Sequence, residues 1–440
     1  MNTKGITLIE TIVAMGIFAI AIAGLYALFN LGTRVLGDNR SRIDATALSN
    51  KRMEMIRNLS YDDIGTVSGI PPGTIERTEI TTINGIDYTI TTDVIYIDDP
   101  FDGIAGEVPD DLFNADYKRI RIEVTWENMM NDLPVILITD VSPKGLETAL
   151  SGGTISFTVF DALGDPVSTA DVHIENTDIV PIIDIDTQTT ANGKLTLPGA
   201  PPSLESYDII VSKAGYSTDQ TYEVDLVDNP NPDPPPLTVF DGVVTEKSFS
   251  IDLLSTLTIN TYTTESAPLG NIDFALQGSK IIGTDGDEAP IYKYSVAQAT
   301  DASGQLVLND MEWDTYDFII DNIGINYDIA GANLPLPISI LPDTSHSVEI
   351  FLAPHTDHSI LVTVRGETGD LIEDASLHLT SIVPPYDNTQ VTSSYGQTFF
   401  SDLSNINYDL NVQADGYDEY DMEIMVEDAT TLDIFLTEST

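Results

Sequence analysis

One apolar segment near the N-terminus constrains this chain more than any other feature. Residues 6–31 read ITLIETIVAMGIFAIAIAGLYALFNL and contain one charged side chain, Glu10. A helix needs roughly 20 apolar residues to cross a bilayer, so the segment is long enough. Two interpretations of this segment are open: a cleaved secretory signal peptide and a retained membrane span. The small residue Gly5 precedes the apolar run and no small-residue cleavage site follows it, which favours a retained span with Lys4 in the cytoplasm.

Glu10 is the most informative residue in this segment. A carboxylate in a membrane helix costs about 2.5–3.5 kcal/mol on insertion scales, so it requires a partner. The nearest candidate is the amine that cleavage after Gly5 would create. The string KGITLIE, residues 4–10, resembles the type IV prepilin signal. This resemblance implies that a prepilin peptidase/methyltransferase cuts after Gly5 and methylates Ile6. It also implies that Glu10 pairs with the amine of a neighbouring pilin in a filament. An ordinary anchor with an isolated Glu is the alternative.

The same helix is predicted to continue well beyond the apolar segment. Apolar residues recur near a 3.6-residue period as far as Leu59, so residues 6–60 are expected to form one helix. Such a helix is roughly 80 Å long at about 1.5 Å per residue. Ala19, Ala23 and Ala27 lie four apart, a stripe of small residues that allows close helix packing. The alternative is that alanine is simply a good apolar helix former.

Residues 61–149 have the pattern of a small antiparallel sheet. Asn84-Gly85 joins two alternating runs, residues 74–83 and 86–97, and this dipeptide is a strong hairpin signal. A second pair of runs covers residues 117–127 and 133–142. Four strands after a long helix resemble a pilin head, which implies a sheet packed on the second half of the helix.

An acidic loop separates these two pairs of runs. Calcium prefers six to eight oxygen ligands, and the loop offers carboxylates among Gly and Pro residues. The spacing matches no EF-hand, so a solvated loop is the alternative to a calcium site. The candidate ligands are Asp98, Asp99, Asp102, Asp110, Asp111 and Asp116.

The rest of the chain contains three similar units, residues 150–254, 255–354 and 355–440. Each has a Tyr-Asp pair that opens an alternating run, with a Gly eight residues after the Tyr. The spacing suits one small β-sandwich per unit, and the units resemble carboxypeptidase-regulatory-like and Ig-like surface modules. The tyrosines, Tyr207, Tyr316 and Tyr408, are predicted to pack at sandwich corners with the hydroxyl bonded to backbone. The proline-rich stretch 229–236 is predicted to be a stiff extended loop within the first unit.

Charge and composition narrow the function. The first 60 residues hold seven basic and four acidic residues, whereas the remaining 380 hold 11 basic and 66 acidic residues. So acidic a body repels phosphate backbones, which argues against nucleic-acid binding. The chain has no cysteine and no recognised catalytic motif, and His355 with His358 is its only close histidine pair. We therefore expect a protein that is not an enzyme.

These observations predict an α+β chain with a leader (1–5), a long helix (6–60), an antiparallel head (61–149) and three all-β sandwich modules. Its expected function is that of a minor or tip subunit of a type IV pilus. The chain would be stored in the inner membrane before assembly with other pilins. Its modules would be outside the cell and would contact an unknown surface ligand. Two alternatives remain: a pseudopilin of a secretion or DNA-uptake apparatus, and an anchored surface protein that never assembles.

Overall fold

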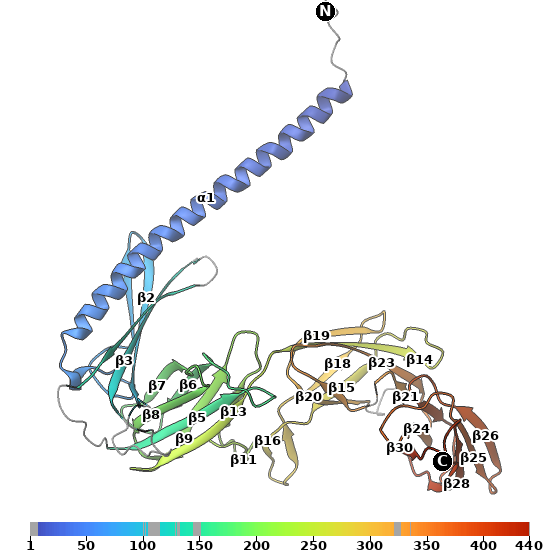
Figure 1. Ribbon diagram of the computed structural model, residues 1–440. Coiled ribbons are helices and arrows are strands. Elements are labelled where there is room, and N and C mark those ends of the chain that lie inside the picture. Colours follow the sequence, from blue (N-terminus) through green and yellow to red (C-terminus); the bar gives the residue numbers. More distant parts are fainter. Residues whose placement is uncertain are drawn as a thin grey trace, which may run out of the picture.

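A long helix dominates the computed structural model (Figure 1). The structure describes residues 8–99, 101, 103, 115–127, 129, 133–143, 151–320, 327–334 and 336–439, without the side chains of residues 8–14 and 20. Helix α1 (Leu8–Arg57) runs unbroken for 50 residues, about 75 Å at about 1.5 Å per residue. It contains no proline, and it ends where the N–H groups of Asn58 and Leu59 bond to carbonyls three residues back, at Met55 and Ile56.

The head is a four-stranded antiparallel sheet in the order β1-β2-β3-β4. Its strands are β1 (Thr78–Ile83), β2 (Ile86–Ile97), β3 (Tyr117–Trp126) and β4 (Val135–Val141). The predicted hairpin is present, and both of its turn residues have positive φ, 53° at Asn84 and 81° at Gly85. Alternate residues of β3 are buried. They form one core with the second half of α1, which contributes Ala45, Leu48, Met53 and Ile56.

Three β-sandwich modules follow the head (Figure 1). We name them the first, second and third modules, spanning residues 151–254, 255–354 and 355–439. In each module the first and last long strands pair in parallel: β5 with β13, β14 with β23 and β24 with β30. A second sheet of antiparallel strands packs against this pair.

The first module contains β5 (Gly153–Phe160), β6 (Asp171–Asn176), β7 (Ile183–Gln188), β8 (Lys194–Ala200), β9 (Ser203–Ser212), β10 (Asp219–Gln220), β11 (Asn231–Pro232), β12 (Leu237–Val239) and β13 (Val244–Ser250). The second contains β14 (Ser255–Thr263), β15 (Asp273–Gly278), β16 (Ile281–Thr284), β17 (Pro290–Tyr292), β18 (Ser295–Ala299), β19 (Gln305–Met311), β20 (Asp314–Ile319), β21 (Tyr327–Ala332), β22 (Ile338–Ile340) and β23 (Ser345–Pro354). The third contains β24 (Ser359–Gly366), β25 (Ser376–Ser381), β26 (Tyr386–Val391), β27 (Gln397–Phe400), β28 (Asn407–Gln413), β29 (Tyr420–Met425) and β30 (Ala429–Leu436).

The repeated tyrosines have the role that the sequence predicts. Tyr207, Tyr316 and Tyr408 are each at most 2% exposed. The Tyr207 hydroxyl donates to the Pro201 carbonyl at 2.7 Å, and the Tyr316 hydroxyl donates to the Glu312 carbonyl at 2.9 Å. The Tyr408 hydroxyl accepts from the Ser404 N–H at 2.8 Å. Each ring therefore fills a core while its hydroxyl is bonded to backbone.

The proline-rich stretch differs from its prediction as a loop of the first module. It supplies β11, which pairs antiparallel with β16 of the second module in a three-stranded sheet β11-β16-β17. The Asp233 N–H also donates to the Ile282 carbonyl at 3.0 Å. A short edge strand tolerates proline because only part of its backbone needs to bond. The sequence pattern could not reveal this partner, which lies about 50 residues away.

Candidate functional site

The predicted processing site lies at the extreme N-terminus. Gly5 and Ile6 lie outside the described residues. Glu10 lies in the first turn of α1, but its side chain is not among those described. The structure therefore places Glu10 on α1, and its pairing stays a prediction.

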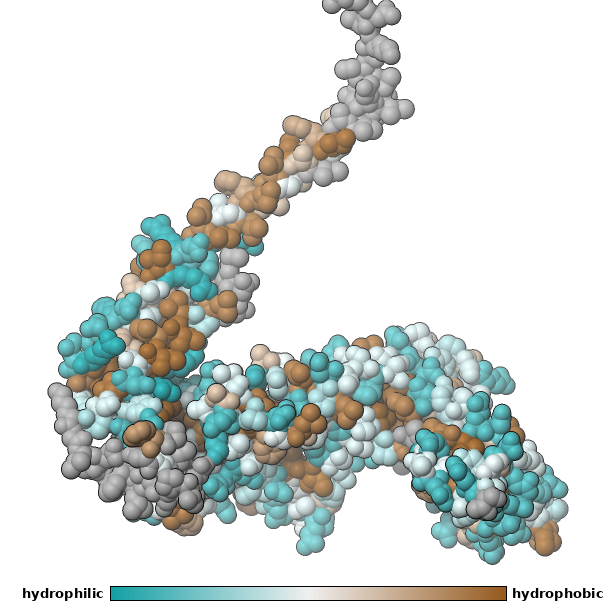
Figure 2. Space-filling view, in the orientation of Figure 1, coloured by the Kyte–Doolittle hydropathy of each residue, from teal (hydrophilic) through white to brown (hydrophobic). Residues whose placement is uncertain are grey.

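The first half of α1 projects from the head and exposes large apolar side chains (Figures 1 and 2). Phe18, Leu25 and Phe29 are each between 67% and 69% exposed. Ala19, Ala23 and Ala27 are also exposed, in line with a surface that could contact other helices. Within the described part of the chain, α1 is the one helix long and apolar enough to span a membrane. Water does not favour such a surface, and within the described residues nothing covers it.

The second half of α1 is fixed to the head by both apolar and polar contacts. The Arg52 guanidinium donates to the Glu76 carbonyl at 2.8 Å and to the Glu79 carboxylate at 2.9 Å. Arg42 donates to the Leu133 carbonyl at 2.8 Å and lies over the Trp126 ring. These bonds fix the direction in which the exposed half leaves the head.

A buried lysine secures the loop that follows α1. Lys118 of β3 is 2% exposed, and its Nζ donates to the Tyr61 carbonyl at 2.8 Å and to the Ile64 carbonyl at 2.7 Å. The ammonium also lies 4.5 Å from the centre of the Tyr61 ring. Burial lowers the pKa of Lys118 to about 8.

The acidic loop is only partly described. Asp102, Asp110 and Asp111 lie outside the described residues, while Asp98, Asp99 and Asp116 lie beside the ends of β2 and β3. The Asp116 carboxylate accepts from the Asp99 N–H, and the Asp116 N–H donates to the Ile97 carbonyl at 3.1 Å. These bonds close the base of the loop. Nothing in the described part tests the calcium prediction, which stays a prediction.

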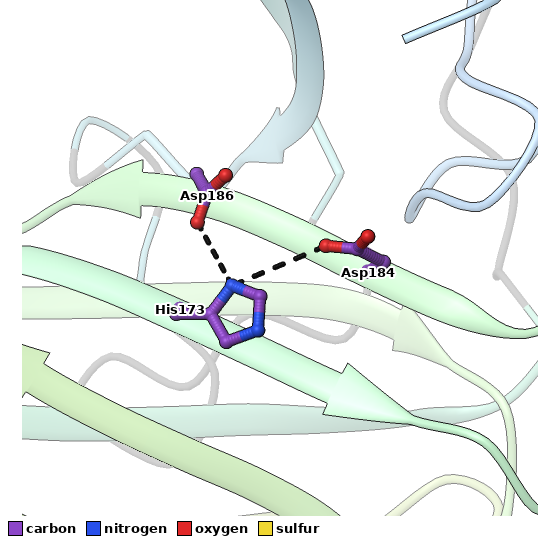
Figure 3. Close-up of side chains that lie close together, drawn as sticks. All are labelled: His173, Asp184 and Asp186. Atoms are coloured by element: carbon purple, nitrogen blue, oxygen red, sulfur yellow. Dashed lines mark hydrogen bonds and ion pairs between the residues drawn. The ribbon is translucent and has the colours of Figure 1, made fainter. Parts of the chain in front are cut away.

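A second acidic group, which the sequence analysis did not identify, lies at the junction of the head and the first module. His173 of β6 faces Asp186 of β7, with 2.8 Å between His173 Nδ1 and Asp186 Oδ1 (Figure 3). Asp184 lies two residues along β7, on the same face, 4.0 Å from the same nitrogen. The ligand atoms of these residues lie close enough together to hold a metal ion.

The chain itself supplies a cation to this group. Arg77 of the head donates to Asp184 at 2.5 Å, to Asp186, and to the buried Asp93 at 3.1 Å. Burial lowers the pKa of Arg77, but the carboxylates of Asp93, Asp186 and Asp184 outweigh it, so the pKa is raised overall. Burial raises the pKa of Asp93 to about 6 despite the adjacent guanidinium. The arrangement is an ionic joint between the head and the first module.

Apolar packing surrounds this joint. Ile70 and Ile95 of the head belong to the same buried cluster as Ile155, Leu195 and Leu197 of the first module. The Asp184 N–H donates to the Ser68 carbonyl at 2.8 Å. Part of the head thus joins the core of the first module, beside the separate core that the head forms with α1. Basic residues are scarce in so acidic a body, and their scarcity is the one sequence signal that could have drawn attention to Arg77 and Lys118.

Comparisons with known proteins identify the N-terminal motif. A family model described as the prokaryotic N-terminal methylation motif matches residues 1–26. No curated protein matches the chain in sequence. The chain therefore carries a pilin-like N-terminal motif, followed by one long apolar helix and a β-rich body.

Several solved structures are also similar, at low scores. The Bacillus anthracis TIE protein is 12% identical, with 83% of this chain and 74% of that protein covered and a TM-score of 0.19. A streptococcal ancillary pilin is 10% identical, with 66% and 99% covered and a TM-score of 0.19. BcpA, the major pilin subunit of Bacillus cereus, is 12% identical, with 66% and 100% covered and a TM-score of 0.17. At such TM-scores no common overall arrangement is established, and these names assign nothing to the present chain.

Proposed function

We propose that this chain is a membrane-stored filament subunit that assembles through the first half of α1 and displays its three modules outside the cell. The observation that carries this proposal is the combination of a methylation motif at residues 1–26 with an exposed apolar half-helix. A bilayer can cover that half-helix before assembly, and neighbouring helices can cover it afterwards. Glu10 is then neutralised by the amine of the adjacent subunit.

We assign the chain to a minor or tip position rather than to the repeating shaft. The three modules extend sideways from the base of the helix, far from its axis (Figure 1). A shaft repeats its subunits closely, so a body of this width would crowd its neighbours. At a tip or at sparse positions, the modules are free to adhere to a surface.

Substitution of Glu10 tests the assembly proposal. The Glu10→Gln variant keeps the length and shape of the side chain and removes its charge. We expect at least a tenfold drop in the amount of this chain in sheared filaments, with the amount in the membrane fraction unchanged. Glu54→Gln, the same change at an exposed acid of the same helix outside the apolar segment, is the matched control and should assemble normally.

Two further measurements separate the alternatives. Mass spectrometry of the mature chain should find an N-terminus at methylated Ile6, whereas a simple anchor would retain Met1. Quantified filaments should contain this chain as a small fraction, and filaments made mainly of it would contradict the minor position. A pseudopilin role predicts instead that deletion of the chain abolishes protein export or DNA uptake.

A further inference from the structure

The junction of the second and third modules carries a row of three aromatic rings. Tyr262 of β14 and Phe351 of β23 are neighbours in the parallel pair, with ring centres 6.0 Å apart and planes 29° apart. Tyr395, in the turn before β27 of the third module, continues the row. Its ring centre lies 6.1 Å from that of Phe351, with 27° between the planes. All three rings remain partly exposed, so the row forms an accessible surface that two modules share.

An open groove of about 810 Å³ runs along these rings. Its volume lies within the range of ligand sites, which combine aromatic walls with a few placed polar groups. Exposed hydroxyls line it on both sides, from Thr264 and Ser266 of the second module and from Ser393 and Ser394 of the third. Surfaces rich in Tyr and Ser recognise ligands well, because rigid rings supply contact area and small hydroxyls supply hydrogen bonds.

The lining of the groove carries much less charge than the rest of the molecule. Among the described residues that line it, Glu349 alone is charged, in a body that is otherwise strongly acidic. The Tyr395 hydroxyl lies 3.5 Å from the Glu349 carboxylate, which can accept hydrogen bonds from a ligand as well. A neutral ligand with many hydroxyls suits this lining, since it needs apolar ring faces and both donors and acceptors but no opposite charge.

The groove is held in shape by bonds between the modules. Gln397 of the third module is 7% exposed, and its Oε1 accepts from the Ala332 N–H of the second module at 2.8 Å. Its Nε2 donates to Thr363 at 3.2 Å. The ideal Cβ of a side chain at Gly331 would lie 3.1 Å from Gln397 Oε1, so the backbone approaches this amide closely. A groove fixed in this way spends little free energy on ordering when a ligand binds.

We propose that this groove binds a neutral oligosaccharide, with the faces or edges of its sugar rings on Phe351 and Tyr395 and its hydroxyls bonded to Glu349 and the surrounding serines. The inference rests on the proposed display of the modules and names the class of ligand that they would contact. It commits to a neutral sugar, and an extended peptide or an acidic sugar is an outcome that would contradict it.

The test uses the full chain in a detergent that has no sugar headgroup, because a sugar detergent would compete. The probes are immobilised neutral oligosaccharides of glucose, galactose, mannose and N-acetylglucosamine, beside sialylated and sulfated ones. We expect binding to at least one neutral group. The dissociation constant is then measured by titration calorimetry with the free oligosaccharide that binds best.

Three variants locate the binding. Phe351→Ala and Tyr395→Ala should each weaken it at least tenfold, while Tyr395→Phe, which keeps the ring, should stay within about threefold of the wild type. Phe435→Ala is the matched control, since Phe435 is an exposed aromatic residue of the third module that does not line the groove. It should bind like the wild type. Circular dichroism confirms that each variant is folded.

The result that overturns the proposal is equally specific. Absence of neutral-sugar binding at millimolar concentration, or wild-type affinity in both alanine variants, would remove the site. Binding to acidic sugars alone would contradict the assigned class. The binding test uses the purified chain outside any filament, so an absence of sugar binding would not contradict the assembly proposal. Likewise, normal assembly of the Glu10→Gln variant would not contradict a measured binding of sugar.

Discussion

The two halves of α1 belong to one continuous helix, but their surroundings differ. In the first half, large side chains such as Phe18 and Phe29 are more than 60% exposed. In the second half, Ala45, Met53 and Ile56 are at most 2% exposed, in one core with the head sheet. The difference teaches that one helix can be an internal part of a fold at one end and an exposed apolar surface at the other. The following experiments test that division.

The largest expected effect comes from a matched pair of isoleucines. Ile56→Ala removes a side chain that is 2% exposed, and it should destabilise the head by about 2–5 kcal/mol. Ile43→Ala, on the same helix at 70% exposure, should change stability by less than about 0.5 kcal/mol. Hydrogen exchange of the β3 amides in the full chain reports on the local stability of the head sheet. Similar exchange rates in the two variants would contradict the division of the helix.

A smaller loss is expected from Lys118→Met. The methionine keeps most of the apolar length but leaves the Tyr61 and Ile64 carbonyls without their donor, at a cost of about 2 kcal/mol. The same exchange measurement on β3 checks this, and a variant as protected as the wild type would show that the lysine does not secure the helix end.

The pH dependence of the head sharpens this prediction. Because burial lowers the pKa of Lys118 to about 8 from its ordinary 10.5, the folded state holds fewer protons than the unfolded state between these values. The stability that the head gains from this shift is fully present above about pH 10.5, and it is lost as the pH falls through about 8. In Lys118→Met, this rise of stability with pH should be absent. If the rise persisted in the variant, another titrating group would be its cause.

The smallest effect compares two arginines of α1. Arg52→Met removes a guanidinium bonded to Glu76 and Glu79 at the sheet, and about 1 kcal/mol should be lost because these contacts are partly solvated. Arg40→Met, at an exposed position before the head, should be neutral. The hydrogen exchange of the β1 amides, measured in the two variants at increasing temperature, compares the stability of the head in each. A larger loss in Arg40→Met would place the boundary between the halves earlier in the helix.

Much of the fold followed from local patterns. The 3.6-residue period of apolar residues predicted the helix, and Asn84-Gly85 predicted the hairpin because both residues tolerate positive φ. The repeated tyrosines were predicted to be buried with their hydroxyls bonded to backbone, and the structure confirms both features. Each of these features depends on residues close together in sequence, so the sequence contains the required information.

The junctions could not be predicted in this way. Arg77 reaches Asp184 and Asp186 from more than 100 residues away, and β11 pairs with β16 across two modules. The local sequence around Asp184 and Asp186 resembles that of the many other acidic residues in the chain. Nothing in it distinguishes Asp184 from a solvated surface carboxylate. The candidate metal ligands of the acidic loop were chosen from local composition alone, and only half of them lie in the described part.

The sequence by itself determined that the chain has a long apolar helix with a methylation motif, a head sheet and three repeated sandwiches, because periodicity and turn residues act over a few residues. The tertiary structure alone decided which half of the helix is buried, where Arg77 joins the head to the first module, and how Tyr262, Phe351 and Tyr395 form one row. The physical reason is that these contacts depend on how separately folded sheets pack together. That packing is a property of complementary surfaces rather than of any local pattern.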